Sequence, residues 1–302
     1  MNDSEKTSFK CGYCAIMGRP NAGKSTLLNQ LCGDMVAIVT DKPQTTRDSI
    51  TAIKTTDKHQ IIFLDTPGLH ESSKALNKKM ARTAEESAES ADVLLFLCDA
   101  SREQFQTDLA LAQKLSAGGK PLLVALNKTD SVRKENLLPL IKKWADAGVG
   151  TIVPISAKTG NGVPELEKEI SSMLPEGPAL YPEDMITDQR ERFLASEIIR
   201  SKIMLFTHME VPYSSMVSVE EYKERSQALT AVKAIIYVEK ESQKGILIGA
   251  GGSMIKRIGK ASREDLEKRF GRKFFLELEV KTRKDWTSDA KFLKRHESDY
   301  KG

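Results

Sequence analysis

The residues best suited to chemistry form one loop, Gly18-Arg19-Pro20-Asn21-Ala22-Gly23-Lys24-Ser25, which has the pattern G-x-x-x-x-G-K-S. An apolar run (13–17) precedes the loop, and a segment with helical spacing (26–31) follows it. Such glycines let backbone N–H groups point inward, and the positive end of the following helix faces the same point. The loop is therefore predicted to bind phosphate, with Lys24 on the β- and γ-phosphates and the Ser25 hydroxyl on Mg²⁺.

A second motif, Asp65-Thr66-Pro67-Gly68, follows the apolar run 61–64. An aspartate at the end of a strand beside a phosphate loop is placed to hold Mg²⁺, usually through water. Gly68 can bring its N–H group close to a γ-phosphate, because it has no Cβ to obstruct the approach. We therefore expect this turn to complete the phosphate and metal site.

Two more motifs indicate a guanine site: Asn127-Lys128-Thr129-Asp130 follows the run 122–126, and Ser156-Ala157-Lys158 follows 151–155. The Asp130 carboxylate can accept two hydrogen bonds from guanine N1–H and N2–H₂. Adenine offers no such pair, so a wrong base would leave a buried charge unpaired, which disfavours an ATPase. The Lys128 stem can lie on the base plane, Asn127 can brace the loop, and a backbone N–H of the second motif can meet guanine O6.

The elements that must position these motifs alternate between strand-like and helical from residue 10 to about residue 174. The predicted strands are 13–17, 50–55, 61–64, 93–98, 122–126 and 151–155, and the predicted helices are 24–31, 74–87, 107–115, 134–147 and 163–173. Most strands are continuously apolar, as expected when both faces are covered. The pattern predicts an α/β fold with a mostly parallel sheet and helices on both faces, and every motif falls at the carboxyl end of a strand.

A proline- and glycine-rich stretch (174–182) interrupts this alternation. After it we expect a helix (190–205), strands 215–222 and 231–239, a glycine cluster (249–252), helices 254–258 and 263–270, and a strand 273–281, which together form a small α+β unit. The predicted organisation is an N-terminal tail (1–9), a first domain (10–174), a linker (175–189), a second domain (190–284) and a C-terminal tail (285–302).

Composition is that of an ordinary soluble protein, with 40% hydrophobic and 29% charged residues among 302. No run approaches the ~18 apolar residues of a membrane span, and the polar N-terminus lacks the apolar core of a signal peptide, so a cytoplasmic location is expected. Cys11 and Cys14 have C-x-x-C spacing, but no second pair or nearby His completes a metal site, which favours reduced, packed thiols. The four His residues likewise form no ligand cluster.

The net charge of +4 is uneven, because residues 240–302 hold 17 Lys and Arg against 10 Asp and Glu. A basic C-terminal part on a near-neutral chain favours a polyanionic partner, either nucleic acid or anionic lipid.

The four motifs, in this order, resemble the translation-factor class of P-loop GTPases. Within that class, Pro43-Gln44-Thr45-Thr46-Arg47 and the phosphate loop resemble the bacterial Era group. The resemblance implies that Thr46 is the mobile-loop Mg²⁺ ligand, with Thr45 as the competing choice. It also implies that Asn21 helps to bind K⁺, which we keep as a hypothesis. Ras-like relatives have a Gln directly after the glycine of the second motif, where this chain has Leu69, so hydrolysis is expected to be slow or to recruit another group.

The predicted catalytic residues are Asn21, Lys24 and Gly68, and the predicted metal ligands are Ser25, Thr46 and Asp65. The predicted nucleotide-binding residues are Gly18, Arg19, Pro20, Asn21, Ala22, Gly23, Lys24, Ser25, Thr26, Asp65, Thr66, Pro67, Gly68, Leu69, Asn127, Lys128, Thr129, Asp130, Ser156, Ala157 and Lys158.

The glycine cluster Gly249-Ala250-Gly251-Gly252 has G-x-x-G spacing and resembles the loop of a type II KH domain. A bare glycine loop lets a nucleic-acid backbone pass close by while a helix N-terminus faces phosphate. The family loop usually carries a basic residue where this chain has Ala250, so that phosphate contact is expected either to be missing or to be taken over by Lys256. The predicted RNA-binding residues are Ile248, Gly249, Ala250, Gly251, Gly252, Ile255, Lys256, Arg257 and Lys260.

By this resemblance the chain is expected to be a GTP-hydrolysing switch that binds the 3′ end of 16S rRNA and assists maturation of the 30S ribosomal subunit. Its expected cofactors are GTP or GDP, Mg²⁺ and, as a hypothesis, K⁺, and a monomer is expected. The alternative is a membrane-surface adaptor whose basic face binds anionic lipid, in which case the protein would rest on the cytoplasmic face of the inner membrane.

Overall fold

The computed structural model describes residues 8–40, 42, 45–68 and 75–298. The described residues form two compact units. Residues 8–37, 46–68 and 80–188 make up the first unit, and residues 38–40, 42, 45, 75–79 and 189–298 make up the second. The domain boundaries expected from the sequence remain a prediction.

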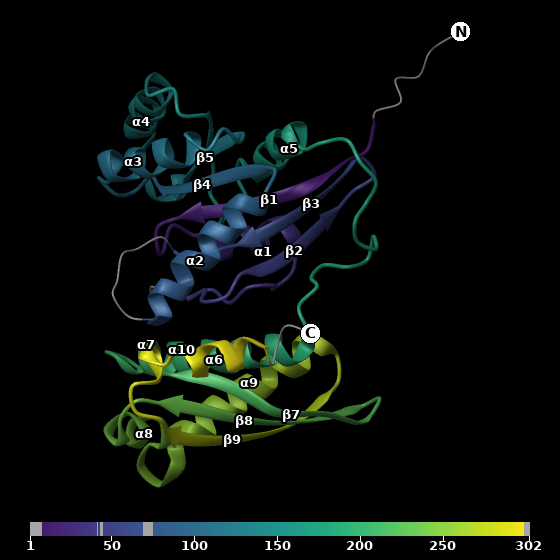
Figure 1. The fold of residues 1–302 in the computed structure, drawn as a ribbon, viewed down its shortest axis with the longest axis vertical. Helices are drawn as coiled ribbons and strands as arrows, with labels where there is room; N and C mark the ends of the chain where they lie inside the picture. Colours follow the sequence, from purple (N-terminus) through teal and green to yellow (C-terminus); the bar gives the residue numbers. More distant parts are fainter. Residues whose placement is uncertain (1–7, 41, 43–44, 69–74, 299–302) are drawn as a thin grey trace. The chain divides into compact units, whose positions relative to one another are not determined.

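The first unit is built on a six-stranded sheet in the order β2-β3-β1-β4-β5-β6. All neighbouring strands are parallel except β2 and β3, which are antiparallel. The strands are β1 (Lys10–Gly18), β2 (Ile50–Thr55), β3 (His59–Asp65), β4 (Val93–Asp99), β5 (Leu122–Asn127) and β6 (Thr151–Pro154). The central strands are buried along almost their whole length, because helices cover both faces of the sheet. The predicted mostly parallel α/β sheet is therefore confirmed (Figure 1).

Helices α2 (Ala75–Ser90), α3 (Phe105–Ser116) and α4 (Lys134–Asp146) pack on one face of the sheet. Their core includes Phe96 of β4, Ala112 of α3 and the fully buried Trp144 of α4. Helices α1 (Lys24–Cys32) and α5 (Val163–Met173) contact each other and the strands β1 and β3. The loops that carry the sequence motifs are thereby held at one edge of a rigid sheet.

The stretch predicted to be a linker is an ordered strap (residues 175–188) that lies along the first unit. The side chain of Gln60 in β3, which is fully buried, accepts hydrogen bonds from the Leu180 and Tyr181 N–H groups at 2.8 and 2.9 Å and donates to the Tyr181 carbonyl. Farther along, the Ile53 N–H of β2 donates to the Ile186 carbonyl at 2.8 Å. Since β2 is an outer strand, the strap covers backbone groups that would otherwise face solvent.

The second unit has a three-stranded sheet in the order β7-β8-β9, in which β7 and β8 are antiparallel and β8 and β9 are parallel. The strands are β7 (Met216–Ser226), β8 (Leu229–Val238) and β9 (Lys273–Thr282). Helices α6 (Glu191–Phe206), α8 (Glu241–Ile248) and α9 (Ser253–Phe270) cover one face, and their core includes Ile199, Leu247 and Ile258, all fully buried. A short helix, α7 (Val211–Ser214), precedes β7.

The predicted helices of this unit were wrong in one respect. The chain forms one helix before the glycine cluster, α8, and a single long helix after it, α9, instead of two short helices after it. The apolar Ile246-Leu247-Ile248 run and Gly245 concealed α8, since β-branched residues and glycine are weak helix formers. Gly259 lies in the gap between the two predicted helices, but a helix tolerates a single glycine at about 0.5–1 kcal/mol.

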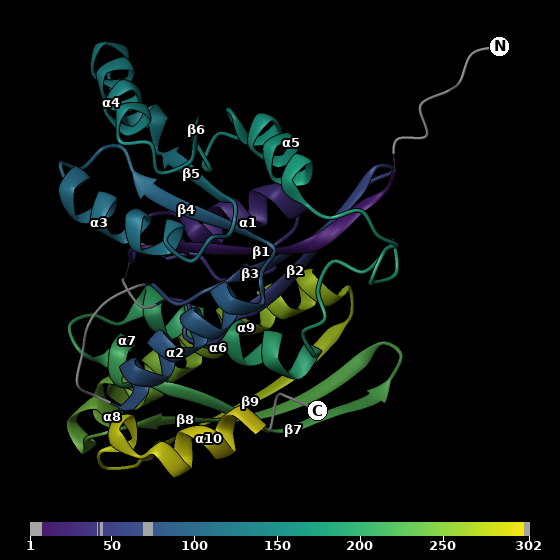
Figure 2. The ribbon, with the colours of Figure 1, turned by 45° about the horizontal axis from the view of Figure 1, so that its top comes forward.

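The predicted C-terminal tail is also folded where the structure describes it. The 3₁₀ turn η3 (Trp286–Ser288) places Trp286 in a fully buried position, where its indole N–H donates to the Ser214 carbonyl at 2.9 Å. Helix α10 (Ala290–Ser298) then packs Phe292 edge-on against Tyr237 of β8. Tyr237 alternates with core residues along its strand, so α10 lies on the sheet face opposite α6 and α9 (Figure 2).

Candidate functional site

The phosphate loop joins β1 to α1, as its sequence predicts. Gly23 has a φ of +99°, and a Cβ at this position would lie 2.3 Å from Nδ2 of Asn127. The same Asn127 amide donates to the Ala22 carbonyl at 2.7 Å, while its Oδ1 accepts from the Ala157 N–H at 2.9 Å. Asn127 therefore ties the phosphate loop to the second guanine-site motif, Ser156-Ala157-Lys158. Only glycine at position 23 leaves room for this arrangement.

Lys24 is almost fully buried, and its ammonium donates to the carbonyls of Gly18 at 3.1 Å and Arg19 at 3.0 Å. Burial lowers the pKa of Lys24 to about 8, although the Asp65 carboxylate opposes this shift. An anionic phosphate in the loop would stabilise the protonated form of Lys24 and so raise its pKa again. The Arg19 guanidinium lies 3.9 Å from Asp108 of α3.

The three predicted metal ligands come together at the end of β3. Oδ2 of Asp65 accepts from the hydroxyls of Ser25 at 2.9 Å and Thr46 at 3.1 Å, and these two hydroxyls are 3.0 Å apart. Burial raises the pKa of Asp65, while Lys24, Ser25 and Thr46 oppose the shift. Oδ1 of Asp65 is buried without a hydrogen-bond partner, which fits a carboxylate shaped to face a cation or its water.

Thr45, the competing ligand, faces elsewhere. Its hydroxyl donates to the Lys42 carbonyl at 2.7 Å and lies 2.8 Å from the Thr40 hydroxyl. The geometry thus favours Thr46 over Thr45 at the metal site. In the described part of the chain no three His, Cys, Asp or Glu side chains are grouped to hold a metal, so a cation here depends on hydroxyls, one carboxylate and the nucleotide itself.

The guanine-site residues lie at the ends of β5 and β6. Oδ1 of Asp130 accepts from the Ser156 hydroxyl at 2.6 Å, and this hydrogen bond is the largest cause of a lowered Asp130 pKa. Asp130 therefore stays ionised and ready to accept from a base. The Thr129 hydroxyl donates to the Ile155 carbonyl at 2.9 Å, which joins the two motifs.

Sequence reasoning missed Asp99, which holds Lys128. Asp99 ends β4, and its Oδ2 accepts from the Lys128 ammonium at 2.7 Å. Burial raises the Asp99 pKa, but hydrogen bonds from Lys128 and Ser101 outweigh it, so the pKa is lowered overall. The sequence did contain a signal for this residue. Asp99 follows the apolar run of a strand, at the same carboxyl end where the neighbouring strands carry their motifs.

Three other predicted positions are used differently or lie outside the described part. The buried Thr66 hydroxyl donates to the Ile16 carbonyl of β1 at 2.8 Å, so it supports the turn and does not point at a ligand. The Ala157 N–H is committed to Asn127. Leu69 lies outside the described residues.

The glycine cluster of the second unit forms a tight link between α8 and α9. Gly249 has a φ of +72°, and a Cβ there would lie 2.8 Å from the backbone N and the Cβ of Met254. Gly251 and Gly252 also have positive φ angles, but a Cβ at Gly251 would meet nothing within 4 Å. Gly249 is therefore required by packing, whereas the Ala250-Gly251 tip is open.

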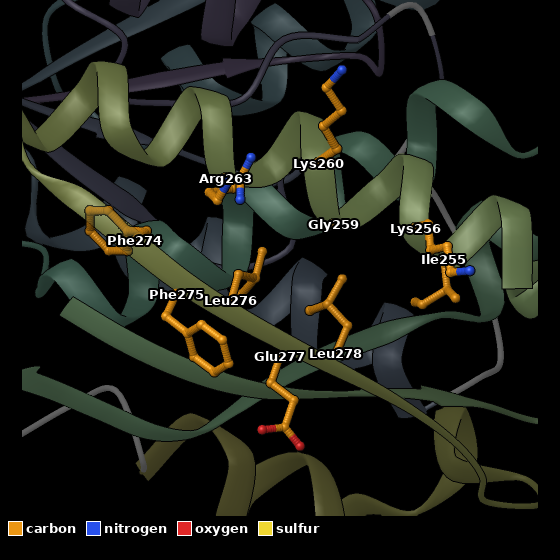
Figure 3. A pocket seen from close by; sticks show the side chains of 10 residues that line it. All are labelled: Ile255, Lys256, Gly259, Lys260, Arg263, Phe274, Phe275, Leu276, Glu277 and Leu278. Atoms are coloured by element: carbon orange, nitrogen blue, oxygen red, sulfur yellow. The ribbon is translucent and has the colours of Figure 1, made fainter. Parts of the chain in front are cut away.

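A groove lies between α9 and β9, and its lining begins at Ile255, three residues after the glycine cluster (Figure 3). The predicted residues Ile255, Lys256 and Lys260 line it. The groove is also lined by Arg263 and by residues 274–278 of β9, which the sequence reasoning missed. The sequence does not show that β9 lies next to α9, because the position of β9 depends on its parallel pairing with β8. Leu276 and Leu278 point toward α9, while Phe275 and Glu277 point away from it.

Apart from the four residues of the glycine cluster, two predicted RNA contacts lie outside this groove's lining. The Arg257 guanidinium stacks 4.2 Å from the centre of the Phe206 ring of α6. Ile248 is partly buried and packs against the core of the second unit.

None of the described helices is long and apolar enough to cross a bilayer.

Comparisons with known proteins match both units. A family described as 50S ribosome-binding GTPase matches residues 13–128, and the KH domain family matches residues 210–287. GTPase Era of Syntrophus aciditrophicus (strain SB) is 50% identical over 288 residues, covering 95% of this chain and 94% of that protein. GTPase Era of Geobacter sp. (strain M21) is 43% identical over 292 residues, covering 96% and 98%.

The chain belongs to the Era family of GTPases.

Solved structures of Era agree with this assignment. An Aquifex aeolicus Era variant bound to GDP and AlF4⁻ has a TM-score of 0.92 at 42% identity, covering 95% of this chain and 99% of that chain. A structure of Era with MgGDPNP and nucleotides 1506–1542 of 16S ribosomal RNA has a TM-score of 0.90 at 42% identity, covering 95% and 98%. The resemblance to the Era group is confirmed, as are the GTPase fold and the KH domain.

Proposed function

We propose that this Era-family chain is a GTP-hydrolysing switch that binds the 3′ end of 16S rRNA through its KH groove and assists maturation of the small ribosomal subunit. The observation that carries the proposal is the presence, in one chain, of the Ser25–Thr46–Asp65 cluster and of the α9–β9 groove. The similarity to Era structures with a GTP analogue and with 16S rRNA supports the choice of both ligands.

The proposed nucleotide chemistry uses the residues of the phosphate loop and of the guanine-site motifs. Loop N–H groups and Lys24 bind the phosphates, Asn127 fixes the loop, and Asp130 accepts from guanine. Ser25 and Thr46 would hold Mg²⁺ directly and Asp65 would hold it through water. When bound, Mg²⁺ supplies positive charge that offsets the charge developing on the transferred phosphoryl group.

The RNA chemistry uses the groove and its loop. The Ala250-Gly251 tip allows a phosphodiester to approach, while Lys256, Lys260 and Arg263 give the groove positive charge. Leu276 and Leu278 offer an apolar floor for unstacked bases. Arg257 and Ile248 remain proposed RNA contacts, but we expect them to contribute less to affinity. Arg257 stacks on Phe206, and Ile248 packs against the core of the second unit.

The test is fluorescence anisotropy of a labelled RNA that copies the 3′ end of 16S rRNA, titrated with protein loaded with a GTP analogue, with GDP, or without nucleotide. The double variant Ala250→Asp/Gly251→Asp should abolish binding. Its matched control, Ala250→Asn/Gly251→Asn, has the same side-chain size without the charge and should retain most of it. Tight binding in the GTP-like state that only the charged variant removes supports the proposal. Binding that ignores both nucleotide and loop would contradict it.

The same titration addresses the membrane-surface alternative. Vesicles with anionic lipid should not compete with the RNA, and we propose a cytoplasmic location with any contact to the inner membrane being peripheral. A monomer is proposed as well, and light scattering should give a mass near 33.5 kDa.

The proposed role of Asn21 in K⁺ binding has a separate test. Asn21 adopts a φ of +62° within the phosphate loop. Replacing K⁺ with Na⁺ should slow hydrolysis in the natural chain, whereas Asn21→Ala should be slow in both salts. An unchanged rate in Na⁺ would remove K⁺ from the mechanism.

A further inference from the structure

A second groove lies in the first unit, between the segment 100–107, which leads from β4 into α3, and the segment 131–143 of η1 (Thr129–Ser131) and α4. Helices α3 and α4 run beside each other there (Figures 1 and 2). This groove is separate from the phosphate loop and from the KH groove, and the nucleotide chemistry described above does not use it.

The groove is lined by an excess of cations together with polar and apolar side chains. Arg102, Arg133 and Lys143 line it, and Glu103 is the one carboxylate among the lining residues, all of which the structure describes. Its apolar lining residues include Val132 and Leu140, which are half-buried. Such a combination suits a ligand that presents carboxylates and apolar groups together.

The aromatic residue of the groove argues against a nucleobase as the ligand. The Phe105 ring packs edge-on against Trp144, with the ring centres 5.2 Å apart, and the Lys143 ammonium lies 4.1 Å over its face. Single-stranded nucleic acids are usually bound by stacking bases on free aromatic faces. A peptide with acidic and aliphatic side chains fits this groove better, because its carboxylates can pair with the cationic lining residues and its aliphatic side chains can contact Val132 and Leu140.

The groove is connected to the guanine site through one carboxylate oxygen. Oδ2 of Asp99 lies 3.3 Å from Nε of Arg102, which faces the groove, and accepts from the Lys128 ammonium at 2.7 Å. A ligand carboxylate that pairs with the Arg102 guanidinium would draw it away from Asp99. The Asp99 carboxylate would then interact more strongly with the Lys128 ammonium. The Lys128 stem, whose place is on the guanine plane, would then be held more firmly.

We propose that this groove binds an acidic, partly apolar peptide segment of a partner protein, and that its occupation slows release of guanine nucleotide through Arg102, Asp99 and Lys128. The proposal rests on the GTPase site alone and not on RNA binding. A failure of the KH groove to bind RNA would therefore leave it intact.

The test uses the full chain loaded with fluorescent GDP and a labelled peptide with the repeating sequence Glu-Glu-Leu. A peptide with Gln in place of Glu is the uncharged control. The acidic peptide should bind, and a saturating amount should slow GDP release about two- to threefold, while the Gln peptide should do neither.

Three variants locate the effect. Lys143→Met should weaken peptide binding about fivefold and leave GDP release without peptide unchanged. Arg102→Gln should also weaken binding about fivefold, but should slow GDP release even without peptide, because it frees Asp99 for Lys128. Arg82→Gln, an exposed α2 arginine paired with Glu86, is the matched control and should change neither quantity.

Each contrary outcome is decisive. Equal binding by Lys143→Met, Arg102→Gln and the natural chain would overturn the site, and binding that leaves GDP release unchanged would overturn its coupling to the nucleotide. If polyuridylic acid displaced the peptide and bound more tightly, the groove would be a nucleic-acid site and the proposal would be wrong. GDP loading of each variant shows that it is folded.

Discussion

At the scale of single residues, two adjacent threonines with the same side chain have different environments because their hydroxyls face different partners. The Thr46 hydroxyl meets Ser25 and Asp65, whereas the Thr45 hydroxyl meets Thr40 and the Lys42 carbonyl. The sequence places both in the same motif and cannot distinguish them, since a one-residue shift of a loop changes no pattern. The choice depends on backbone geometry that only the fold supplies.

This difference gives a clear prediction. Thr46→Ala should lower the rate of GTP hydrolysis at saturating Mg²⁺ by at least about tenfold, because one ligand worth ~1.4 kcal/mol or more is lost from the transition state. Thr45→Ala should stay within about threefold of the natural rate. The measurement is single-turnover phosphate release across a Mg²⁺ titration. A larger loss for Thr45→Ala than for Thr46→Ala would reverse the ligand assignment.

A second residue-scale prediction concerns pH. The Asp99 pKa lies below its ordinary value of 3.8 in the folded chain, so its ionised form stabilises the fold at higher pH, and this contribution is lost as pH falls through the folded-state pKa. Asp99→Asn should therefore lower the free energy of unfolding near neutral pH, and the deficit should shrink as the pH drops below 3.8.

Urea unfolding of both proteins between about pH 3 and pH 7 measures this difference. The exposed Asp146→Asn of α4 is the control for loss of a surface carboxylate and should lower the free energy of unfolding near neutral pH less than Asp99→Asn does. A deficit that grows on acidification would mean that the Asp99 pKa is raised in the fold.

At the scale of elements, α9 combines support for the fold with the lining of a groove. Gly259 lies within this helix, where a Cβ would meet only the Leu278 side chain, at 3.6 Å. Gly259→Ala should therefore stabilise the helix by about 0.5–1 kcal/mol. The added methyl group would nevertheless occupy the groove that Gly259 lines, so RNA affinity should fall severalfold.

Thermal unfolding and RNA anisotropy, measured on the same preparation, test both halves of this prediction. Gly245→Ala in α8 is the matched control, because a Cβ there meets nothing within 4 Å and the residue does not line the groove. It should raise stability without changing RNA affinity. If both variants weakened RNA binding equally, helix rigidity and not groove volume would be the cause.

The elements themselves were predictable to different degrees. Strands such as β4 and β5 were predicted well, because a strand covered on both faces is continuously apolar. Helices α8 and α9 were not, since Gly245 and Gly259 lie inside them and their helicity comes from packing of Leu247 and Ile258 on the sheet. In these helices, burial of apolar side chains outweighs the low helix propensity of the two glycines.

At the scale of the whole molecule, the strap shows what a sequence pattern conceals. Its three prolines and its one glycine are typical of a linker, yet Gln60 holds it with three hydrogen bonds to Leu180 and Tyr181. These partners lie 120 and 121 residues away from Gln60 in the chain. No local pattern can indicate such a pairing. The guanine and phosphate motifs were found because their residues are local, and Asp99 and the β9 lining were missed because theirs are not.

The strap gives a prediction for global stability. Gln60→Leu leaves the Leu180 and Tyr181 N–H groups without their partner, which should lower the free energy of unfolding of the first unit by about 2–3 kcal/mol. It should also speed chymotrypsin cleavage after Leu180, in the same segment of the strap. The exposed Gln113→Leu of α3 is the control and should change neither quantity. Unaltered cleavage in Gln60→Leu would mean that the strap is held chiefly by the Ile53–Ile186 pairing.

The strap also determines when the first unit can be finished during synthesis. All six strands of its sheet have been made once residue 154 has left the ribosome, but the partners of Gln60 and Ile53 follow later, at residues 180–186. At ~5–20 residues per second this leaves an interval of seconds in which β2 presents an open edge in the crowded cell. The nascent chain is therefore most vulnerable to association with other chains just before residue 189, where the main stretch of its second unit begins.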